Sequence, residues 1–311
     1  MAVRAVLQRL VKCVIATCAS ATDAPSRRFH LPPTVHAVVH KPSARTIIIG
    51  DIHGCLHELD RLLADLAHDA TTDCVVLVGD LVNKGPHSAA VVHAARTRGF
   101  LAVRGNHDDR AIFAWEERER KRLTGMGTSS DDAKYAYVDD FSQADVDYLR
   151  GLPYTLLLEA EGVLVVHAGI VPGVPLESQH PMHLYTMRNI IPQGGEAYNR
   201  RTAEATSRAG DNLMPKKIAA CESSRLVAIP FLHMDGWSST SDVGVAWASK
   251  WRPDESSLPG VRHVVFGHDA KRGLQQHEFA TGLDTGCCAW QIASPSRMLL
   301  PAAEMRTVLS F

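Results

Sequence analysis

Short apolar runs that end in glycine recur along this chain, and each of them predicts a buried β-strand. Residues 46–50 and 73–79 are the first two runs, and a leucine-rich amphipathic stretch at 55–68 predicts a helix between them. A second helix is predicted at 89–98 and a third strand at 100–104. This alternation is typical of parallel β-α-β units, whose functional residues gather at the carboxyl edge of the sheet.

The remainder of the chain divides into a helical part, a hairpin and a less regular part. Residues 108–150 are charged and predict helices, one of which begins with a capping box from Ser142 to Asp145. An antiparallel hairpin is predicted at 154–166. Residues 171–260 have weak periodicity and much Pro, Gly, Ser and Arg, so we interpret them as an insertion over the site rather than a separate domain. Further strands are predicted at 261–267, 275–280 and 283–288, with a last hairpin around 294–296.

Polar side chains with metal-binding chemistry follow these runs at the points where the strands end. They are two aspartates, one asparagine and three histidines, namely Asp51, His53, Asp80, Asn106, His167 and His268. An isolated histidine is usually a packed or surface residue, but this set combines carboxylate, carboxamide and imidazole ligands. Such a mixture suits two borderline divalent cations a few ångströms apart, which can clamp an in-line phosphoryl displacement.

Five ordered motifs carry a resemblance to a known family. They read Gly50-Asp-Ile-His-Gly54, Gly79-Asp-Leu-Val-Asn-Lys-Gly85, Gly105-Asn-His-Asp108, Val166-His-Ala-Gly169 and Gly267-His268. Over roughly residues 45–290 they resemble the calcineurin-like metallophosphoesterases. Together with Thr186-Met-Arg-Asn189 and Leu283-Asp-Thr-Gly-Cys287, they resemble the symmetrical diadenosine tetraphosphatases and ApaH-like phosphatases within that superfamily. Ser/Thr protein phosphatases would instead show Asp-Arg-Gly, Asn-His-Glu and His-Gly-Gly in the second, third and fourth motifs.

The resemblance implies an α/β fold of the calcineurin-like metallophosphoesterase type, with two packed mixed β-sheets flanked by helices. The domain would span residues 43–311 and follow an amino-terminal extension at 1–42. Two divalent metal ions would be held, with Asp51, His53 and His268 on one, Asn106 and His167 on the other, and Asp80 bridging both. These ligands suit manganese, zinc, iron or cobalt, and manganese is the ion expected to support activity in vitro.

His107 follows the ligand Asn106 and is the candidate general acid for the leaving oxygen. In the protein phosphatases its partner is an aspartate three residues after the bridging ligand, and Asn83 occupies that place here. A neutral carboxamide can orient the ring but stabilises imidazolium less than a carboxylate does. Since a phosphate leaving group has a second pKa of about 6, it departs with little protonation, whereas an alkoxide needs the proton. Asn83 therefore favours an anhydride substrate.

Four basic side chains are candidates for binding substrate phosphates, because charge on the non-bridging oxygens requires fixed cations. Lys84 and Arg188 match phosphate-contacting positions of the family. Arg104 is either a phosphate ligand or a structural ion-pairing residue. Arg272 is either a phosphate ligand or a solvated surface residue.

Composition narrows the classes of partner. The net charge of −1 gives no generic nucleic-acid surface, so a polyanion must be bound by a local basic site. No apolar run approaches the roughly 20 residues that span a bilayer. Seven cysteines without a Cys-x-x-Cys motif predict reduced thiols in an intracellular protein. The basic, acid-poor start at residues 1–30 fits a mitochondrial transit peptide or a loosely docked extension, so the expected location is mitochondrial or cytoplasmic.

These features predict a metal-dependent phosphohydrolase that cleaves phosphoanhydride bonds. Diadenosine tetraphosphate, a related dinucleoside polyphosphate, an RNA cap and inorganic polyphosphate all present that bond. The alternative is a Ser/Thr protein phosphatase, which Asn83, Lys84 and Asp108 disfavour. A third possibility is a metal-bound binding module without catalysis, which would be expected to lack a ligand, and none is missing here.

Overall fold

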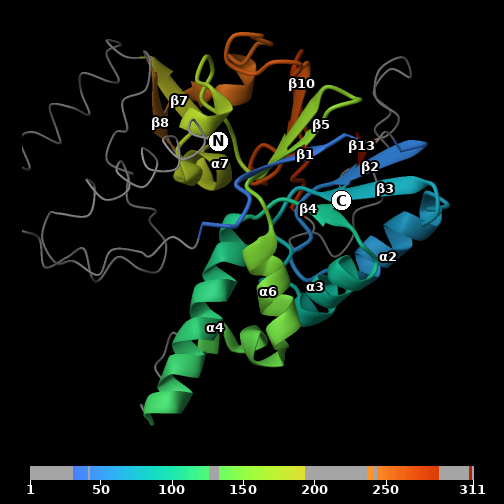
Figure 1. Cartoon of the computed structure of the whole chain (residues 1–311), viewed down its shortest axis with the longest axis vertical. Helices are drawn as coiled ribbons and strands as arrows, with labels where there is room; N and C mark the ends of the chain where they lie inside the picture. Colours follow the sequence, from blue (N-terminus) through green and yellow to red (C-terminus); the bar gives the residue numbers. More distant parts are fainter. Residues whose placement is uncertain are drawn as a thin grey trace, which may run out of the picture. The chain divides into compact units, whose positions relative to one another are not determined.

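A computed structural model describes the chain at residues 31–40, 43–125, 133–192, 237–240, 244–286 and 308–309. Two main β-sheets with helices on their outer faces form the described part (Figure 1). This arrangement confirms the predicted α/β fold. None of the described helices is long and apolar enough to cross a membrane.

The four-stranded sheet has the order β13-β2-β3-β4 and is parallel in every described pairing. Its strands are β2 (Arg45–Ile49), β3 (Asp73–Leu77), β4 (Leu101–Ala102) and β13 (Val308–Leu309). Helices α2 (Leu56–Asp65) and α3 (Ser88–Thr97) connect the first three strands, as the β-α-β pattern predicts. This sheet is therefore parallel, whereas the sequence analysis expected two mixed sheets.

Alternation along β2 and β3 explains how the parallel sheet is buried on both faces. Ile47 and Ile49 pack against the helical layer, while Ile48 between them faces the second sheet. The helical layer contains α2, α3, α4 (Asn106–Thr124), the 3₁₀ helix η1 (Ala136–Asp140) and α6 (Gln143–Gly151). The predicted capping box is present at α6, where Ser142 accepts from the Asp145 N–H and Asp145 accepts from the Ser142 N–H.

The six-stranded sheet is mixed and has the order β1-β5-β6-β10-β12-β11. Its strands are β1 (His36–Val39), β5 (Thr155–Leu158), β6 (Val163–Val166), β10 (His263–Phe266), β11 (Gln275–Gln276) and β12 (Ala280–Gly282). The predicted hairpin is β5–β6, and β6 then pairs in parallel with β10. As a result, residues that follow β6 and β10 emerge side by side at one edge.

Two further apolar layers complete the packing. Val76 of β3 and Val78 just after it belong to one buried apolar cluster with Val165 and Val265 of the mixed sheet. On the outer face of the mixed sheet lie α7 (Pro181–Thr186) and the 3₁₀ helix η3 (Trp247–Ser249). The sheets are therefore stacked face to face between two outer layers.

Three strands outside both sheets form a small antiparallel sheet in the order β8-β7-β9. They are β7 (Asn189–Pro192), β8 (Trp237–Thr240) and β9 (Val245–Ala246), and all fall in the predicted insertion. The remaining described element is the 3₁₀ helix η2 (Leu176–Ser178). Residues 193–236 of the insertion, 126–132 of the predicted loop and the predicted hairpin at 294–296 lie outside the described residues.

Two stretches differ from the sequence-based assignment. The strand predicted at 283–288 is wrong in its described part, because β12 ends at Gly282 and the chain then turns, with the Gly286 N–H donating to the Asp284 carboxylate. β1 lies within the stretch assigned to the amino-terminal extension, yet it pairs in parallel with β5. The sheet therefore includes residues that precede position 43, and residues 1–30 lie outside the described part.

Candidate metal centre

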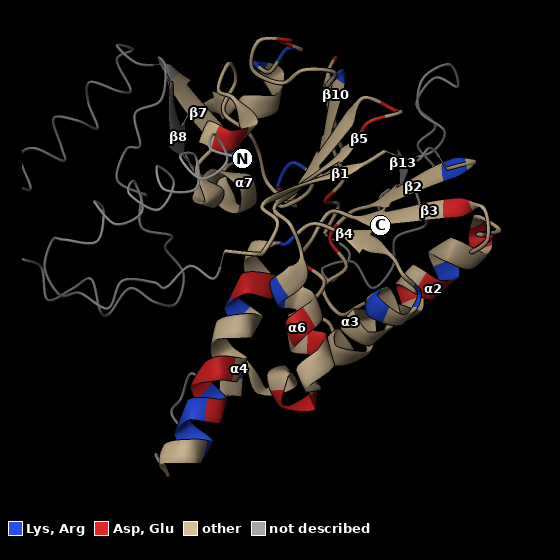
Figure 2. Ribbon diagram, in the orientation of Figure 1, with Lys and Arg blue, Asp and Glu red and all other residues tan. Residues whose placement is uncertain are grey.

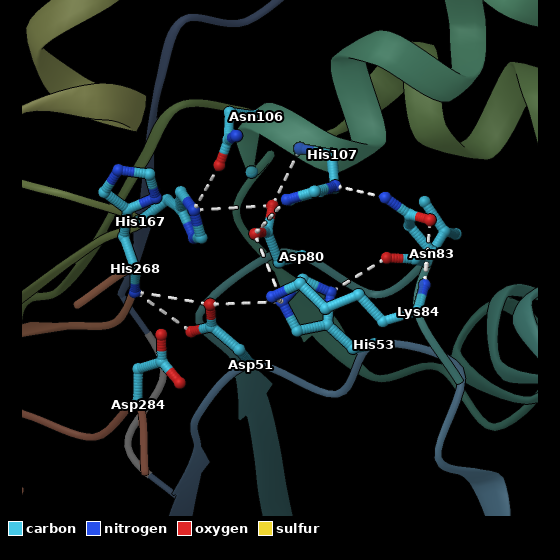
Figure 3. Close-up of polar contacts among 12 residues, drawn as sticks. Asp51, His53, Asp80, Asn83, Lys84, Asn106, His107, His167, His268 and Asp284 are labelled. Carbon is cyan, nitrogen blue, oxygen red and sulfur yellow. Dashed lines mark hydrogen bonds and ion pairs between the residues drawn. The ribbon is translucent and has the colours of Figure 1, made fainter. Parts of the chain in front are cut away.

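Side chains from the ends of both sheets converge on one place (Figure 3). Asp51 follows β2, Asp80 follows β3, Asn106 begins α4 just after β4, His167 follows β6, and His268 follows β10. The two sheets are joined here directly, because the His268 N–H donates to the Asp51 carboxylate at 3.1 Å. All six predicted ligands are therefore brought together, with His53 two residues beyond Asp51.

The orientation of the imidazoles of His53, His167 and His268 turns one ring nitrogen of each toward the centre. His53 Nδ1 lies 3.0 Å from the Val82 carbonyl oxygen, and His167 Nδ1 lies 2.8 Å from that of Val78. Each carbonyl accepts the Nδ1 proton and so turns Nε2 toward the centre, which is the usual support of a metal-binding histidine. Nε2 of His268 is buried and has no hydrogen-bond partner among the described residues.

Asp80 lies between the imidazoles. Its Oδ1 is 3.4 Å from Nε2 of His167, and its Oδ2 is 3.6 Å from Nε2 of His53. Burial alone would raise the pKa of Asp80, but the imidazoles of His167 and His107 outweigh burial and hold that pKa well below its usual range. Conversely, Asp80 overcomes the opposing effect of burial and raises the pKa of His167 to about 10.

A third carboxylate lies near those of Asp51 and Asp80 and was not predicted as part of the site. Asp284, which is not among the predicted ligands, is only 5% exposed. Burial raises the pKa of Asp51 well above its usual range, and the negative charge of Asp284 raises it further. Three nearby buried carboxylates are costly unless cations neutralise them, so the donor set fits bound divalent metal ions.

The donor atoms form two groups that share Asp80. His53, Asp80 and His107 make one group, and Asp80, His167 and His268 make the other, with the donor atoms of each group within 4.8 Å of one another. His268 therefore groups with His167, and not with the predicted partners Asp51 and His53. The reason is topological, since His167 and His268 follow the neighbouring parallel strands β6 and β10.

Glycines allow the ligands to approach this closely. A Cβ atom on Gly105 would lie 2.2 Å from Oδ1 of Asp80, and one on Gly267 would lie 2.1 Å from Oδ1 of Asp51. Each glycine precedes one ligand and faces another. The glycines of these two motifs are therefore steric requirements of the centre.

Several residues of the site have left-handed backbone conformations that side chains other than glycine rarely adopt. These are His53 with φ 48°, Asp80 with φ 51°, Asn83 with φ 72°, Lys84 with φ 66° and His268 with φ 67°. Asp108 supports one of these turns, because its buried carboxylate accepts the N–H groups of Asp80, Leu81 and Gly105. The carboxylate thereby joins the end of β3 to the start of α4.

His107 contacts the predicted partner. Nδ1 of His107 lies 2.7 Å from Nδ2 of Asn83, while Oδ1 of Asn83 accepts the Lys84 N–H at 2.8 Å. The ammonium group of Lys84 lies 2.6 Å from Nε2 of His53. The Lys84 cation therefore faces the nitrogen through which His53 would bind a metal ion.

Comparison with known proteins agrees with this geometry. A family model described as calcineurin-like phosphoesterase matches residues 44–272. The chain belongs to the calcineurin-like phosphoesterase family. Two relatives named symmetrical bis(5'-nucleosyl)-tetraphosphatase, from Yersinia pestis (strain Pestoides F) and Yersinia pseudotuberculosis (serotype O:1b), are each 28% identical over 261 residues, or 78% of this chain and 85% of theirs. A crystal structure of a candidate diadenosine tetraphosphatase is 29% identical, with a TM-score of 0.58, covering 82% of this chain and 90% of that one.

One of the four candidate phosphate ligands of this calcineurin-like phosphoesterase is wrongly assigned. Arg104 is 0% exposed, and its guanidinium pairs with Asp109 at 3.3 Å, bonds to the Arg150 carbonyl oxygen and lies 5.3 Å from the centre of the Tyr154 ring. A side chain enclosed in this way cannot contact a substrate. The structural alternative for Arg104 is the correct one.

The candidates Arg188 and Arg272 lie beside the candidate ligand His268. Arg188 donates to the His268 carbonyl oxygen from Nη2 at 2.9 Å and from Nε at 3.2 Å, and Nε lies 3.8 Å from Asp269. Arg272 pairs with the other oxygen of Asp269 and donates to Oδ1 of Asn189 at 2.6 Å. The buried Asp269 thus holds Arg188 and Arg272 together beside a ligand.

Proposed function

We propose that this calcineurin-like phosphoesterase hydrolyses phosphoanhydride bonds, with a dinucleoside polyphosphate such as diadenosine tetraphosphate as its substrate. The observation that carries the proposal is the contact between His107 and Asn83, where a carboxamide stands beside the ring. The activity in the names of the Yersinia relatives supports the same substrate class. Hydrolysis would release two molecules of ADP from diadenosine tetraphosphate.

The metal ligands proposed are Asp51, His53, Asp80, Asn106, His167 and His268, holding two divalent cations. The oxygen and nitrogen donors suit manganese, zinc, iron or cobalt. When bound, such cations polarise phosphoryl oxygens and activate water at neutral pH. Asp80 lies between the two groups of donors and is the bridging ligand in this scheme.

His107 acts as a neutral hydrogen-bond donor to the leaving oxygen. Because the Lys84 N–H donates to Oδ1 of Asn83, the amide presents its NH₂ group to Nδ1 of His107. Nδ1 must then accept, which puts the ring proton on Nε2, the nitrogen that lies 3.9 Å from Asp80. Burial, the largest cause, lowers the pKa of His107 to about 4 and also favours the neutral ring.

This protonation state suits a leaving group that needs no proton. A departing phosphate is stable as an anion near neutral pH, whereas a serine alkoxide requires full proton transfer. Lys84 and Arg188 bind the non-bridging oxygens in this proposal. Arg188 is held by the His268 carbonyl and Asp269, so its position is fixed before substrate arrives.

The test is a hydrolysis panel on the full-length protein supplied with manganese. Diadenosine tetraphosphate, long-chain polyphosphate, capped RNA and a phosphoserine peptide are compared by product chromatography, with Asp80→Asn as the blank. Turnover of the dinucleotide to ADP without turnover of the peptide is expected. Asn83→Asp is the matched variant, and it should raise activity on the phosphoserine peptide relative to the dinucleotide. Peptide turnover by the wild type without any anhydride cleavage would refute the proposal in favour of a protein phosphatase.

A further inference from the structure

Arg110 differs from every other arginine of α4. Arg118 pairs with Asp139, Arg120 with Glu117 and Arg122 with Glu119. Figure 2 shows the charges of both signs that line this helix. Arg110 has no hydrogen bond or ion pair with any described residue, although its side chain is part-buried. A part-buried guanidinium without a counter-charge is available to pair with an external anion.

The helix directs Arg110 toward the metal centre. It follows Asn106 by four residues and His107 by three, so the three side chains share one face of α4. Side chains on a helix lean toward its amino terminus and cover the preceding turn. Arg110 therefore lies over the turn that carries Asn106 and His107, and its positive charge is one of those that lower the pKa of His107.

A second unpartnered polar group lies within the electrostatic reach of Arg110. The Tyr137 hydroxyl of η1 is buried and has no hydrogen-bond partner among the described residues. Burial raises the pKa of Tyr137, negative charge on Asp108 and Asp80 raises it further, and Arg110 lowers it. The α4–η1 side of the centre thus has a cation, Arg110, without a counter-ion among the described residues, on the same helix face as His107.

We propose that Arg110 binds the phosphates of the leaving half of the substrate, beyond the bond that is cleaved. This inference rests on the proposed function, and it specifies a chain of several phosphates. The planar guanidinium can donate two parallel hydrogen bonds to the oxygens of one phosphate. A phosphomonoester has no such phosphate, so Arg110 selects polyphosphates over phosphate esters.

The experiment compares Arg110→Gln with wild type on two substrates, diadenosine tetraphosphate and p-nitrophenyl phosphate. Loss of a charge-assisted contact should lower kcat/KM for the dinucleotide about 10- to 100-fold. With p-nitrophenyl phosphate, kcat/KM should stay within about twofold, and the inhibition constant of ADP should rise about tenfold. Arg110→Lys should recover part of the loss, and it also serves if Arg110→Gln fails to fold. Arg120→Gln on the same helix is the control for charge removal and should match wild type.

Two results would overturn the inference. One is unchanged dinucleotide turnover in Arg110→Gln. The other is an equal loss of turnover on both substrates, because that would indicate a general effect on the site. Failure of the proposed function itself gives a different result, in which wild type cleaves p-nitrophenyl phosphate but no anhydride. In that case, calorimetric binding of inorganic triphosphate decides. Weaker binding to Arg110→Gln supports the phosphate site, and equal binding refutes it.

Discussion

Removing the charge of Arg104 should destabilise the protein while leaving substrate affinity intact. Arg104 follows β4 directly and precedes the glycine of the third motif, so from the sequence it could equally be a phosphate ligand. In the structure it is fully buried against Asp109, the Arg150 carbonyl oxygen and the ring of Tyr154. Arg104→Met leaves the Asp109 carboxylate without its ion-pair partner, and Asp109→Leu leaves the Arg104 guanidinium without its partner.

The structure sets the size of the effect. Breaking a buried ion pair by removing one partner typically costs about 3–5 kcal/mol, because the remaining charge stays desolvated. For a large domain each kcal/mol lowers the melting temperature by roughly 2–4 °C, so each single variant should melt about 6–20 °C below wild type. Replacing both members with apolar residues removes both charges, and the double variant Arg104→Met/Asp109→Leu should regain most of the loss.

The assay combines urea unfolding with steady-state kinetics at a temperature where all the variants are folded. KM for diadenosine tetraphosphate should stay within about twofold of wild type for Arg104→Met, because no atom of this side chain is exposed. A tenfold or larger rise in KM with unchanged unfolding would refute the structural role and restore Arg104 as a phosphate ligand. Additive losses in the double variant would show that the two residues are not coupled.

Three further predictions concern the ligand geometry, the first strand and acid stability. Gly105→Ala should abolish manganese binding measured by mass spectrometry, since the added Cβ would lie 2.2 Å from a ligand oxygen, whereas Gly151→Ala, with nothing within 4 Å, should bind normally. Deleting residues 1–40 removes β1 and should give insoluble or strongly destabilised protein, because β5 loses its parallel partner strand. His183 is 1% exposed, and burial lowers its pKa from 6.5 to about 4. The unfolded chain therefore gains this proton first, and stability should fall by about 3 kcal/mol as pH drops from 6.5 to 4. His183→Leu should unfold with a shallower pH dependence, and an unchanged slope would argue against this assignment.

The convergence of the six candidate ligands could be predicted because each lies just after an apolar run that forms a buried strand. Asp51 and Asp80 stand in such positions, and parallel strands place their carboxyl ends together. β1 was missed because its strand is short and only partly buried, so its pattern resembles that of an extension. Whether such a short segment forms a strand depends on tertiary contacts, which the hydrophobic periodicity does not show. In the fold, β1 extends the mixed sheet beside β5.

The errors at the site have the same physical origin. Nothing local distinguishes Arg104 from a phosphate ligand, because its partner Asp109 becomes apparent only when α4 turns that carboxylate inward. The grouping of His268 with His167 depends on which strands are neighbours, and residues about 100 positions apart give no sign of that pairing. Asp284 was overlooked because the turn that brings it beside Asp51 was read as a strand.

The left-handed backbone at the centre bears on whether this chain is an active enzyme or a relic. His53, Asp80, Asn83, Lys84 and His268 each adopt a positive φ, at roughly 1 kcal/mol or more per residue relative to glycine. Glycine at any of these positions would relieve that strain and stabilise the fold. Five strained residues gathered at one centre are typical of a functional site, where backbone strain is tolerated for the side chains that it positions. This concentration of strain supports an active enzyme.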